Sequence, residues 1–195
     1  MIKNIILFFI FLILPNFSLA CDKEDFLKYV SAEKNRCIAL QTIGEINKNK
    51  KNLIIFLHGD LSSGTKPPGK KGYWKLGNEL LSKNVNFFFL ARPGYTLDSG
   101  RKSYGSYKET RKAKTNYKWE KLELVAKAAQ NLKEYYNADN LIMIGHSGGA
   151  LTSATINSRV PKLIDKSILI SCPCDFEKWR KMRGESVYKM KTSPH

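Results

Sequence analysis

The feature that most constrains the fold is residues 141–150, which read Leu-Ile-Met-Ile-Gly-His-Ser-Gly-Gly-Ala. The four leading apolar residues are typical of a strand buried on both faces. They are followed by G-H-S-G-G, which fits the strand–turn–helix motif G-x-S-x-G, and residues 150–159 have the composition of a short helix. Such a turn holds its serine in a strained conformation, and glycine is needed two residues before and after it to avoid a collision. We therefore predict that Ser147 is a catalytic nucleophile.

The first twenty residues are predicted to be a secretory signal peptide. Lys3 is followed by an unbroken apolar run at 5–14 and by the small-x-small sequence Ser18-Leu19-Ala20. The apolar run is too short to span a membrane, which takes about 20 residues. We expect a secreted or periplasmic protein whose residues 21–195 form one domain. A lipid anchor on Cys21 is the alternative, although Ser18 stands where such sites usually carry leucine.

The sequence has a formal net charge of +16, which favours anionic partners such as acidic lipids or envelope polymers. Lysine far outnumbers arginine, and asparagine and isoleucine are abundant, as AT-rich coding would produce. The charge is spread along the chain, without the interleaved aromatic and basic residues of a nucleic-acid-binding module. Specific nucleic-acid binding is therefore not predicted.

The four cysteines become potential disulfide partners in an exported protein. Cys21 and Cys37 are close enough in sequence to pair. Cys172 and Cys174 flank a single proline, and we expect a bridge across one residue to be strained, so that each thiol is free or pairs elsewhere. Neither has the paired spacing of a zinc site, and the chain has only three histidines, so no metal or cofactor is predicted.

Strands and helices alternate along the chain. The strands are expected at 38–43, 53–57, 85–90, 141–144 and 167–171. The helices are expected at 21–36, 73–82, 122–136 and 150–159. The polar stretch 96–117 is expected to be an exposed excursion over the sheet edge. The basic residues from 101 to 121 are interpreted as a solvated face, with substrate gating as the alternative. This order predicts an α/β fold with a doubly wound, mostly parallel sheet.

Three motifs follow buried strands, and the carboxyl ends of such strands are where this architecture binds ligands. They are residues 58–60 (His-Gly-Asp), residues 92–95 (Arg-Pro-Gly-Tyr) and residues 145–149. Acyl transfer at a serine needs two donors for the oxyanion. We assign these donors to the amide of Gly148, which opens a helix, and to the amide of Asp60.

Other polar and aromatic residues of these loops have less definite roles. His58 is interpreted as a structural residue that packs the oxyanion loop, and His146 as a residue that packs beside the elbow. Arg92 either binds a substrate anion or pairs with a carboxylate to fix its loop. Tyr95 and Tyr104 either line the pocket or cover the sheet edge.

With these motifs, residues 38–175 resemble the α/β-hydrolase family, in its esterase-like and prolyl-oligopeptidase-like branches. The resemblance implies that Ser147 forms an acyl-enzyme with an ester or a small peptide. It also implies an acid and a base after the serine. Asp175 is the candidate acid, and His195 is the only later histidine and hence the candidate base. Asp165 precedes its strand and so lies at the wrong end of the sheet.

The segment after the elbow holds one further predicted strand, fewer than the family has. We therefore expect a C-terminally shortened α/β-hydrolase domain that lacks the last strands and leaves a sheet edge uncovered. The alternative to an enzyme is a non-catalytic remnant, or an envelope-associated binding protein, that keeps the fold without the base.

Overall fold

The computed structural model describes residues 25–60, 70–80, 84–106 and 117–185. The predicted signal peptide, Cys21 and His195 lie outside the described residues. Within the described ranges, no helix is both long enough and apolar enough to cross a membrane.

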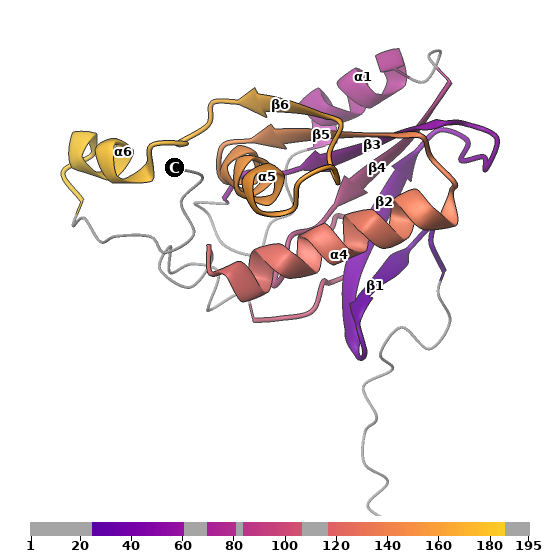
Figure 1. Ribbon diagram of the computed structural model, residues 1–195, viewed down its shortest axis with the longest axis horizontal. Coiled ribbons are helices and arrows are strands. Elements are labelled where there is room, and N and C mark those ends of the chain that lie inside the picture. Colours follow the sequence, from indigo (N-terminus) through magenta and orange to yellow (C-terminus); the bar gives the residue numbers. More distant parts are fainter. Residues whose placement is uncertain (1–24, 61–69, 81–83, 107–116, 186–195) are drawn as a thin grey trace, which may run out of the picture.

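A six-stranded sheet organises the domain, with strand order β1-β2-β4-β3-β5-β6 (Figure 1). The strands are β1 Tyr29–Glu33, β2 Arg36–Ile43, β3 Asn52–Leu57, β4 Val85–Leu90, β5 Asn140–His146 and β6 Lys166–Ile170. The helices are α1 Lys70–Leu80, α4 Trp119–Tyr135, α5 Gly148–Arg159 and α6 Phe176–Met182. The four strands from β4 to β6 are parallel, and β2 is antiparallel to both of its neighbours. The predicted α/β architecture with a mostly parallel sheet is confirmed.

Helices cover both faces of the sheet, which explains the continuous apolar runs in the central strands (Figure 1). Successive side chains of a strand point to opposite faces. In β3, Leu53, Ile55 and Leu57 pack in one core with α4 and α5. Ile54 and Phe56 pack in a second core against α1. Both faces of β3 are therefore buried.

The predicted helix at 21–36 is wrong, because the described part of this segment forms β1 and a tight turn into β2. Val30 and Ala32 are buried and alternate with partly exposed neighbours, which is the period of a strand. Asn35 turns the chain with a φ of 63°, and Tyr29 then pairs with Ala39. The helical spacing of apolar residues near the start of this segment also fits a strand that follows a turn.

The stretch at 96–117, expected to be an exposed excursion, is exposed only in part in its described residues, because residues 98–100 face solvent while others are buried. Leu97, Ser103 and Tyr117 are buried. The Ser103 hydroxyl accepts a hydrogen bond from the Ala39 amide at 2.8 Å and donates to the Ala91 carbonyl at 2.6 Å. These contacts fasten the segment to the sheet; residues 107–116 lie outside the described part of the chain.

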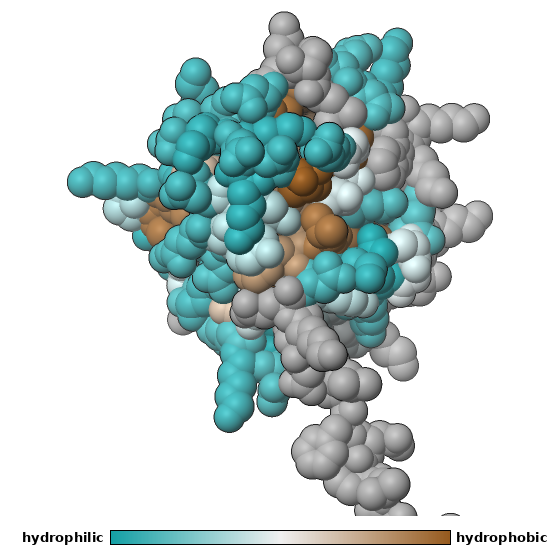
Figure 2. Space-filling view, turned by 90° about the vertical axis from the view of Figure 1, so that its right-hand side faces the viewer, coloured by the Kyte–Doolittle hydropathy of each residue, from teal (hydrophilic) through white to brown (hydrophobic). Residues whose placement is uncertain are grey.

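The sheet ends at β6, whose apolar side chains are exposed. Ile168 is 49% exposed and Leu169 is 40% exposed. Within the described residues β6 pairs only with β5, so the expected uncovered edge is present. On the side of the molecule shown in Figure 2, hydrophilic residues predominate and surround separate hydrophobic areas.

Candidate active site

Ser147 lies at a sharp turn between β5 and α5, with φ 51° and ψ −118°. This conformation is strained for any residue other than glycine and persists only where its surroundings hold it. The Ser147 amide donates to the Ile170 carbonyl of β6 at 2.8 Å, and the Ser147 carbonyl accepts from the amides of Ala150 and Leu151 at 2.9 and 3.1 Å. The predicted strand, turn and helix are confirmed.

Glycine is required on either side of this turn for the steric reason expected from the sequence. A Cβ atom on Gly145 would lie 2.5 Å from the Ala150 Cα atom. A Cβ atom on Gly149 would overlap the Leu57 carbonyl of β3. A Cβ atom on Gly59 would lie 3.0 Å from the Ser147 Cβ atom, so the loop after β3 is packed directly against the turn.

The strand register brings the three motifs to one edge of the sheet. Leu57 of β3 is level with Leu90 of β4 and with Gly145 of β5. His58, Arg92 and the serine turn therefore leave the sheet side by side. This convergence agrees with the prediction that the motifs share a site beyond the carboxyl ends of the strands.

The Asp60 carboxylate lies at the centre of this cluster. It accepts hydrogen bonds from the Arg92 guanidinium, from the Tyr95 hydroxyl at 3.1 Å and from the Tyr117 hydroxyl at 2.5 Å. A Cβ atom on Gly148 would lie 2.8 Å from Asp60 Oδ1, so the carboxylate sits against the first residue of α5. Tyr117 was not singled out in the sequence, because nothing there indicates that it reaches Asp60.

Arg92 pairs with Asp60, which confirms the second of the two roles considered for it. Its side chain is only 3% exposed, whereas that of Asp60 is 43% exposed. The arginine is therefore packed away from solvent and from any substrate, and its Nε atom has no hydrogen-bond partner among the described residues. Tyr95 is likewise buried and fixes this cluster instead of lining an open pocket.

The charges of the pair govern the pKa values in the cluster. Desolvation raises the pKa of Asp60. The positive charge of Arg92 and the hydrogen bonds that the Asp60 carboxylate accepts outweigh this effect and lower the pKa below its ordinary value. Burial lowers the pKa of Arg92, and the negative charge of Asp60 reverses this and raises it. Burial, and then the charge of Asp60, raise the pKa of Tyr117, which stays a hydrogen-bond donor.

His58 is a buried structural residue, as the sequence indicated. Its Nε2 atom accepts the Arg92 amide at 3.1 Å, and its Nδ1 atom lies 2.7 Å from the Gly59 carbonyl. These partners assign the proton to Nδ1. Burial, together with the charge of Arg92, lowers the pKa of His58 to about 3, so the ring is neutral and both nitrogens are occupied.

The predicted acid and base are not brought to the serine by any contact in the described residues. Asp175 is the N-cap of α6 and accepts the Lys178 amide at 3.0 Å. His195 lies outside the described residues. In the part of the chain that the structure describes, no side chain is hydrogen-bonded to the Ser147 hydroxyl. The catalytic roles of Ser147, Asp175 and His195, and the oxyanion roles of Gly148 and Asp60, stay predictions.

Asp165 occupies the opposite end of the sheet, as expected. It accepts the Leu141 amide at 2.7 Å, where β5 begins, and pairs with Lys133 at 2.8 Å. The described residues contain no group of three or more His, Cys, Asp or Glu side chains that could hold a metal ion.

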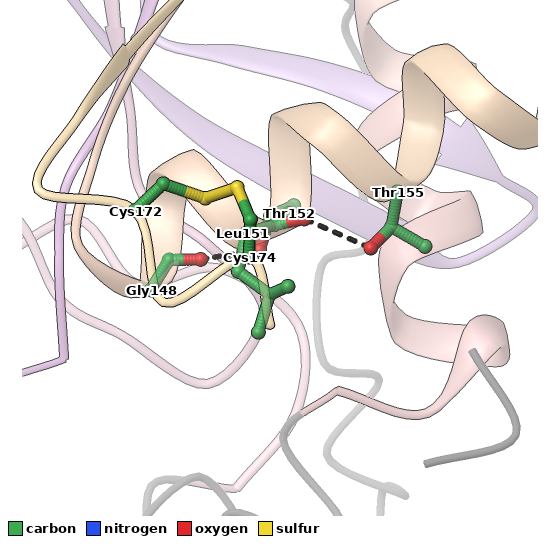
Figure 3. Close-up of a disulfide and its surroundings, with 6 residues drawn as sticks. All are labelled: Gly148, Leu151, Thr152, Thr155, Cys172 and Cys174. Atoms are coloured by element: carbon green, nitrogen blue, oxygen red, sulfur yellow. Dashed lines mark hydrogen bonds between the residues drawn. A yellow bond between two sulfur atoms is a disulfide. The ribbon is translucent and has the colours of Figure 1, made fainter. Parts of the chain in front are cut away.

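The interpretation of Cys172 and Cys174 as unpaired with each other is wrong, because the structure joins them in a disulfide (Figure 3). The chain bends at the buried Pro173, and the two Cα atoms lie 5.1 Å apart, which is within the range that a disulfide bridges. Cys37 is also disulfide-bonded.

Comparison with known proteins identifies the architecture. No family model matches the chain, and no curated protein matches it. Among solved structures it is similar to the esterase Est1E from Butyrivibrio proteoclasticus, determined with ferulic acid bound, at a TM-score of 0.58 and 18% identity. It is also similar to the Pyrococcus furiosus esterase Pf2001, at a TM-score of 0.57 and 20% identity. The chain has the α/β-hydrolase fold.

The match spans most of this chain and a smaller part of each neighbour. It covers 85% of this chain and 60% of Est1E, and 83% of this chain and 56% of Pf2001. A thioesterase domain from the curacin biosynthetic pathway is matched over 74% of this chain and 43% of its own length, with a TM-score of 0.53 and 21% identity. At these identities the likeness establishes the fold alone, and the prolyl-oligopeptidase-like branch stays a prediction.

Proposed function

We propose that this α/β-hydrolase domain belongs to a serine hydrolase that cleaves an ester through an acyl-enzyme on Ser147. The observation that carries the proposal is the strained backbone of Ser147, which the ends of β3, β5 and β6 hold in place. Strained backbone conformations cluster at functional sites. In this proposal the strain at Ser147 serves to project its hydroxyl above the sheet.

In the proposed reaction, the Ser147 oxygen attacks the ester carbonyl while a base removes its proton. The tetrahedral oxyanion accepts hydrogen bonds from the amides of Gly148 and Asp60. The alcohol then leaves with the proton, and water hydrolyses the acyl-enzyme to a carboxylic acid. By resemblance to the family, His195 is the base and Asp175 the acid that orients it.

The electrostatics of the cluster suit this proposal. A carboxylate so close to Gly148 would repel a developing oxyanion if its charge were uncompensated. Arg92 supplies the opposite charge to Asp60, and the N-terminal turn of α5 adds a positive potential with amide donors that lack partners within the helix. The arrangement allows Asp60 to fix its loop without opposing the charge that forms in the transition state.

The proposed substrate is a small ester. Two of the similar structures are esterases, and one of them was determined with ferulic acid. A small peptide is the alternative acyl donor. We further propose that the protein acts outside the cytoplasm, where its charge of +16 favours contact with an anionic envelope surface.

A non-catalytic binding protein is the second candidate function. It is favoured by one observation: the carboxylate of Asp175, the candidate acid, is the N-cap of α6 and accepts the Lys178 amide. Loss of the base from a triad enzyme leaves a residual rate of about 10³ to 10⁴ over water.

Labelling with a fluorophosphonate probe distinguishes the two functions. We expect the folded protein to be labelled, and the label to be lost in Ser147→Ala. The matched control is Ser158→Ala, which removes an exposed serine from the same helix and should leave labelling unchanged. Absence of labelling in the folded wild-type chain would support the binding protein.

A further inference from the structure

We infer that the Cys172–Cys174 disulfide is a thiol–disulfide exchange site whose oxidation state controls the geometry and reactivity of Ser147. The proposed thiol–disulfide exchange and its effect on the conformation of the Ser147 turn are argued from the structure of the chain alone. The effect on reactivity rests on the proposed function.

The disulfide lies between β6 and α6, against the start of the nucleophile helix. Figure 3 shows it beside the first turns of α5, with Gly148, Leu151 and Thr152 around it. Cys172 and Cys174 are both partly exposed, and Cys172 packs against the core shared with α4 and α5. A thiol from outside can therefore approach the bond, while the bond itself contacts the helix that begins at the serine turn.

A short stretch of backbone connects the disulfide to the serine. The Ser147 amide donates to the carbonyl of Ile170, the last residue of β6. Ser171 follows with a φ of 50°, which is strained for a residue with a side chain, and Cys172 comes next. The disulfide therefore restrains the segment that supplies the acceptor for the Ser147 amide.

The covalent topology indicates a local role for this bond. A disulfide stabilises a protein globally by closing a loop in the unfolded chain, and the effect grows with the length of the loop. Cys172 and Cys174 are only 2 residues apart in sequence, so their bridge adds little to global stability. It does fix the conformation of the bend between Cys172 and Cys174, which are both partly exposed.

The exchange requires a dithiol, either a small molecule or a protein. One thiolate of the dithiol attacks a sulfur of the disulfide and forms a mixed disulfide, which releases one cysteine as a thiol. The second thiol of the reductant then displaces the other cysteine. Two electrons and two protons pass to Cys172 and Cys174, and the dithiol becomes a disulfide.

Reduction frees residues 170–174 to relax, and two consequences follow. The hydrogen bond from the Ser147 amide to the Ile170 carbonyl weakens, so the amide exchanges with solvent deuterium faster. The strained serine turn loses one of its supports, so labelling by a fluorophosphonate slows. We expect each rate to change by at least threefold, and to return when the disulfide re-forms.

The test uses a Cys21→Ser/Cys37→Ser variant, in which Cys172 and Cys174 are the remaining cysteines of the four. The folded variant is incubated with dithiothreitol without denaturant, and the free thiols are counted by alkylation and mass spectrometry. Reduction under these conditions supports the exchange site. Resistance to reduction until the protein is unfolded would overturn it.

The coupling is measured on the same oxidised and reduced samples, by amide exchange of the peptide that contains Ser147 and by the rate of labelling. Adding Cys172→Ser and Cys174→Ser to the Cys21→Ser/Cys37→Ser variant should give a protein that behaves like the reduced form and that dithiothreitol does not affect further. Equal amide exchange in the oxidised and reduced states refutes the coupling. If neither state is labelled, the proposed hydrolase function fails, and the amide exchange still decides whether the disulfide controls the turn.

Discussion

Replacement of Asp60 by asparagine tests the charge cluster beside the serine turn. The substitution keeps the size of the side chain and removes its charge, which leaves the Arg92 guanidinium without its carboxylate. Arg92 is 3% exposed, so water does not replace the lost partner. Breaking a fully buried ion pair by removing one partner costs about 3–5 kcal/mol.

The exposure of Asp60 reduces this cost. Because the carboxylate is 43% exposed, part of its attraction to Arg92 is screened by solvent. An exposed pair contributes only about 0–1 kcal/mol. We therefore expect a value between the two limits, about 2 kcal/mol, for the free energy of unfolding lost in Asp60→Asn.

Urea denaturation followed by circular dichroism measures the loss. With a slope of roughly 2 kcal/mol per molar urea, the midpoint should fall by roughly 1 M while the slope is unchanged. The matched control is Asp139→Asn, which neutralises an exposed carboxylate for which the described residues show no ion pair. Its midpoint should stay close to that of the wild type.

The pH dependence gives the same prediction an independent check. The pKa of Asp60 is lowered in the folded protein relative to its ordinary value of 3.8. The carboxylate therefore stabilises the fold fully above the unfolded pKa, and the contribution is lost as the pH falls through the folded pKa. The stability difference between wild type and Asp60→Asn should be largest at neutral pH and shrink below pH 3.8. A variant as stable as the wild type at pH 7, or a difference independent of pH, would refute the reasoning.

Four further substitutions, one of them a control, test the packing and hydrogen bonding around the site and the exposure of the sheet edge. Gly149→Ala places a methyl group on the Leu57 carbonyl and should lower the unfolding free energy by roughly 3 kcal/mol. The control is Gly100→Ala, whose added methyl group meets no atom within 4 Å. Because Gly100 has a φ of 80°, this control should still lower the unfolding free energy by about 1 kcal/mol. Thermal melts of the two variants should differ accordingly, and equal melting temperatures would contradict the steric account. Tyr117→Phe removes a hydrogen bond to a carboxylate and should lower the unfolding free energy by about 1.5–3 kcal/mol in urea titrations, while a neutral effect would mean that Asp60 needs no such donor. Ile168→Lys, at a side chain that is 49% exposed, should change the unfolding free energy by less than about 0.5 kcal/mol, and a larger loss would show that the β6 edge is covered in solution.

The central elements could be predicted from the sequence because their patterns have one physical meaning. Six consecutive residues of β4 are buried, and only a strand between two layers of helices buries such a run in a parallel sheet. The turn at Ser147 was equally predictable, because the glycines at 145 and 149 have no room for a side chain. Local sequence was sufficient in both cases.

Other elements depend on contacts that no local pattern reveals. Tyr117 reaches a carboxylate 57 residues earlier in the chain, and its hydroxyl is buried at the end of a basic stretch that looks solvated. β1 was mistaken for a helix because a few apolar residues fit either period, and its pairing with β2 decided the matter. The disulfide between Cys172 and Cys174 depends on a backbone bend at Pro173 that the spacing alone did not suggest.

The acyl-enzyme on Ser147 is tested most directly by measuring the mass of the protein while it hydrolyses a chromogenic acetyl ester. Samples are quenched with acid in the first turnovers and digested with a protease. One acetyl group is expected on the peptide that contains Ser147, absent from Ser147→Ala and present in Ser158→Ala. Hydrolysis of the ester at the same rate in Ser147→Ala, with no acetylated Ser147 in the wild type, would contradict the proposed acyl-enzyme.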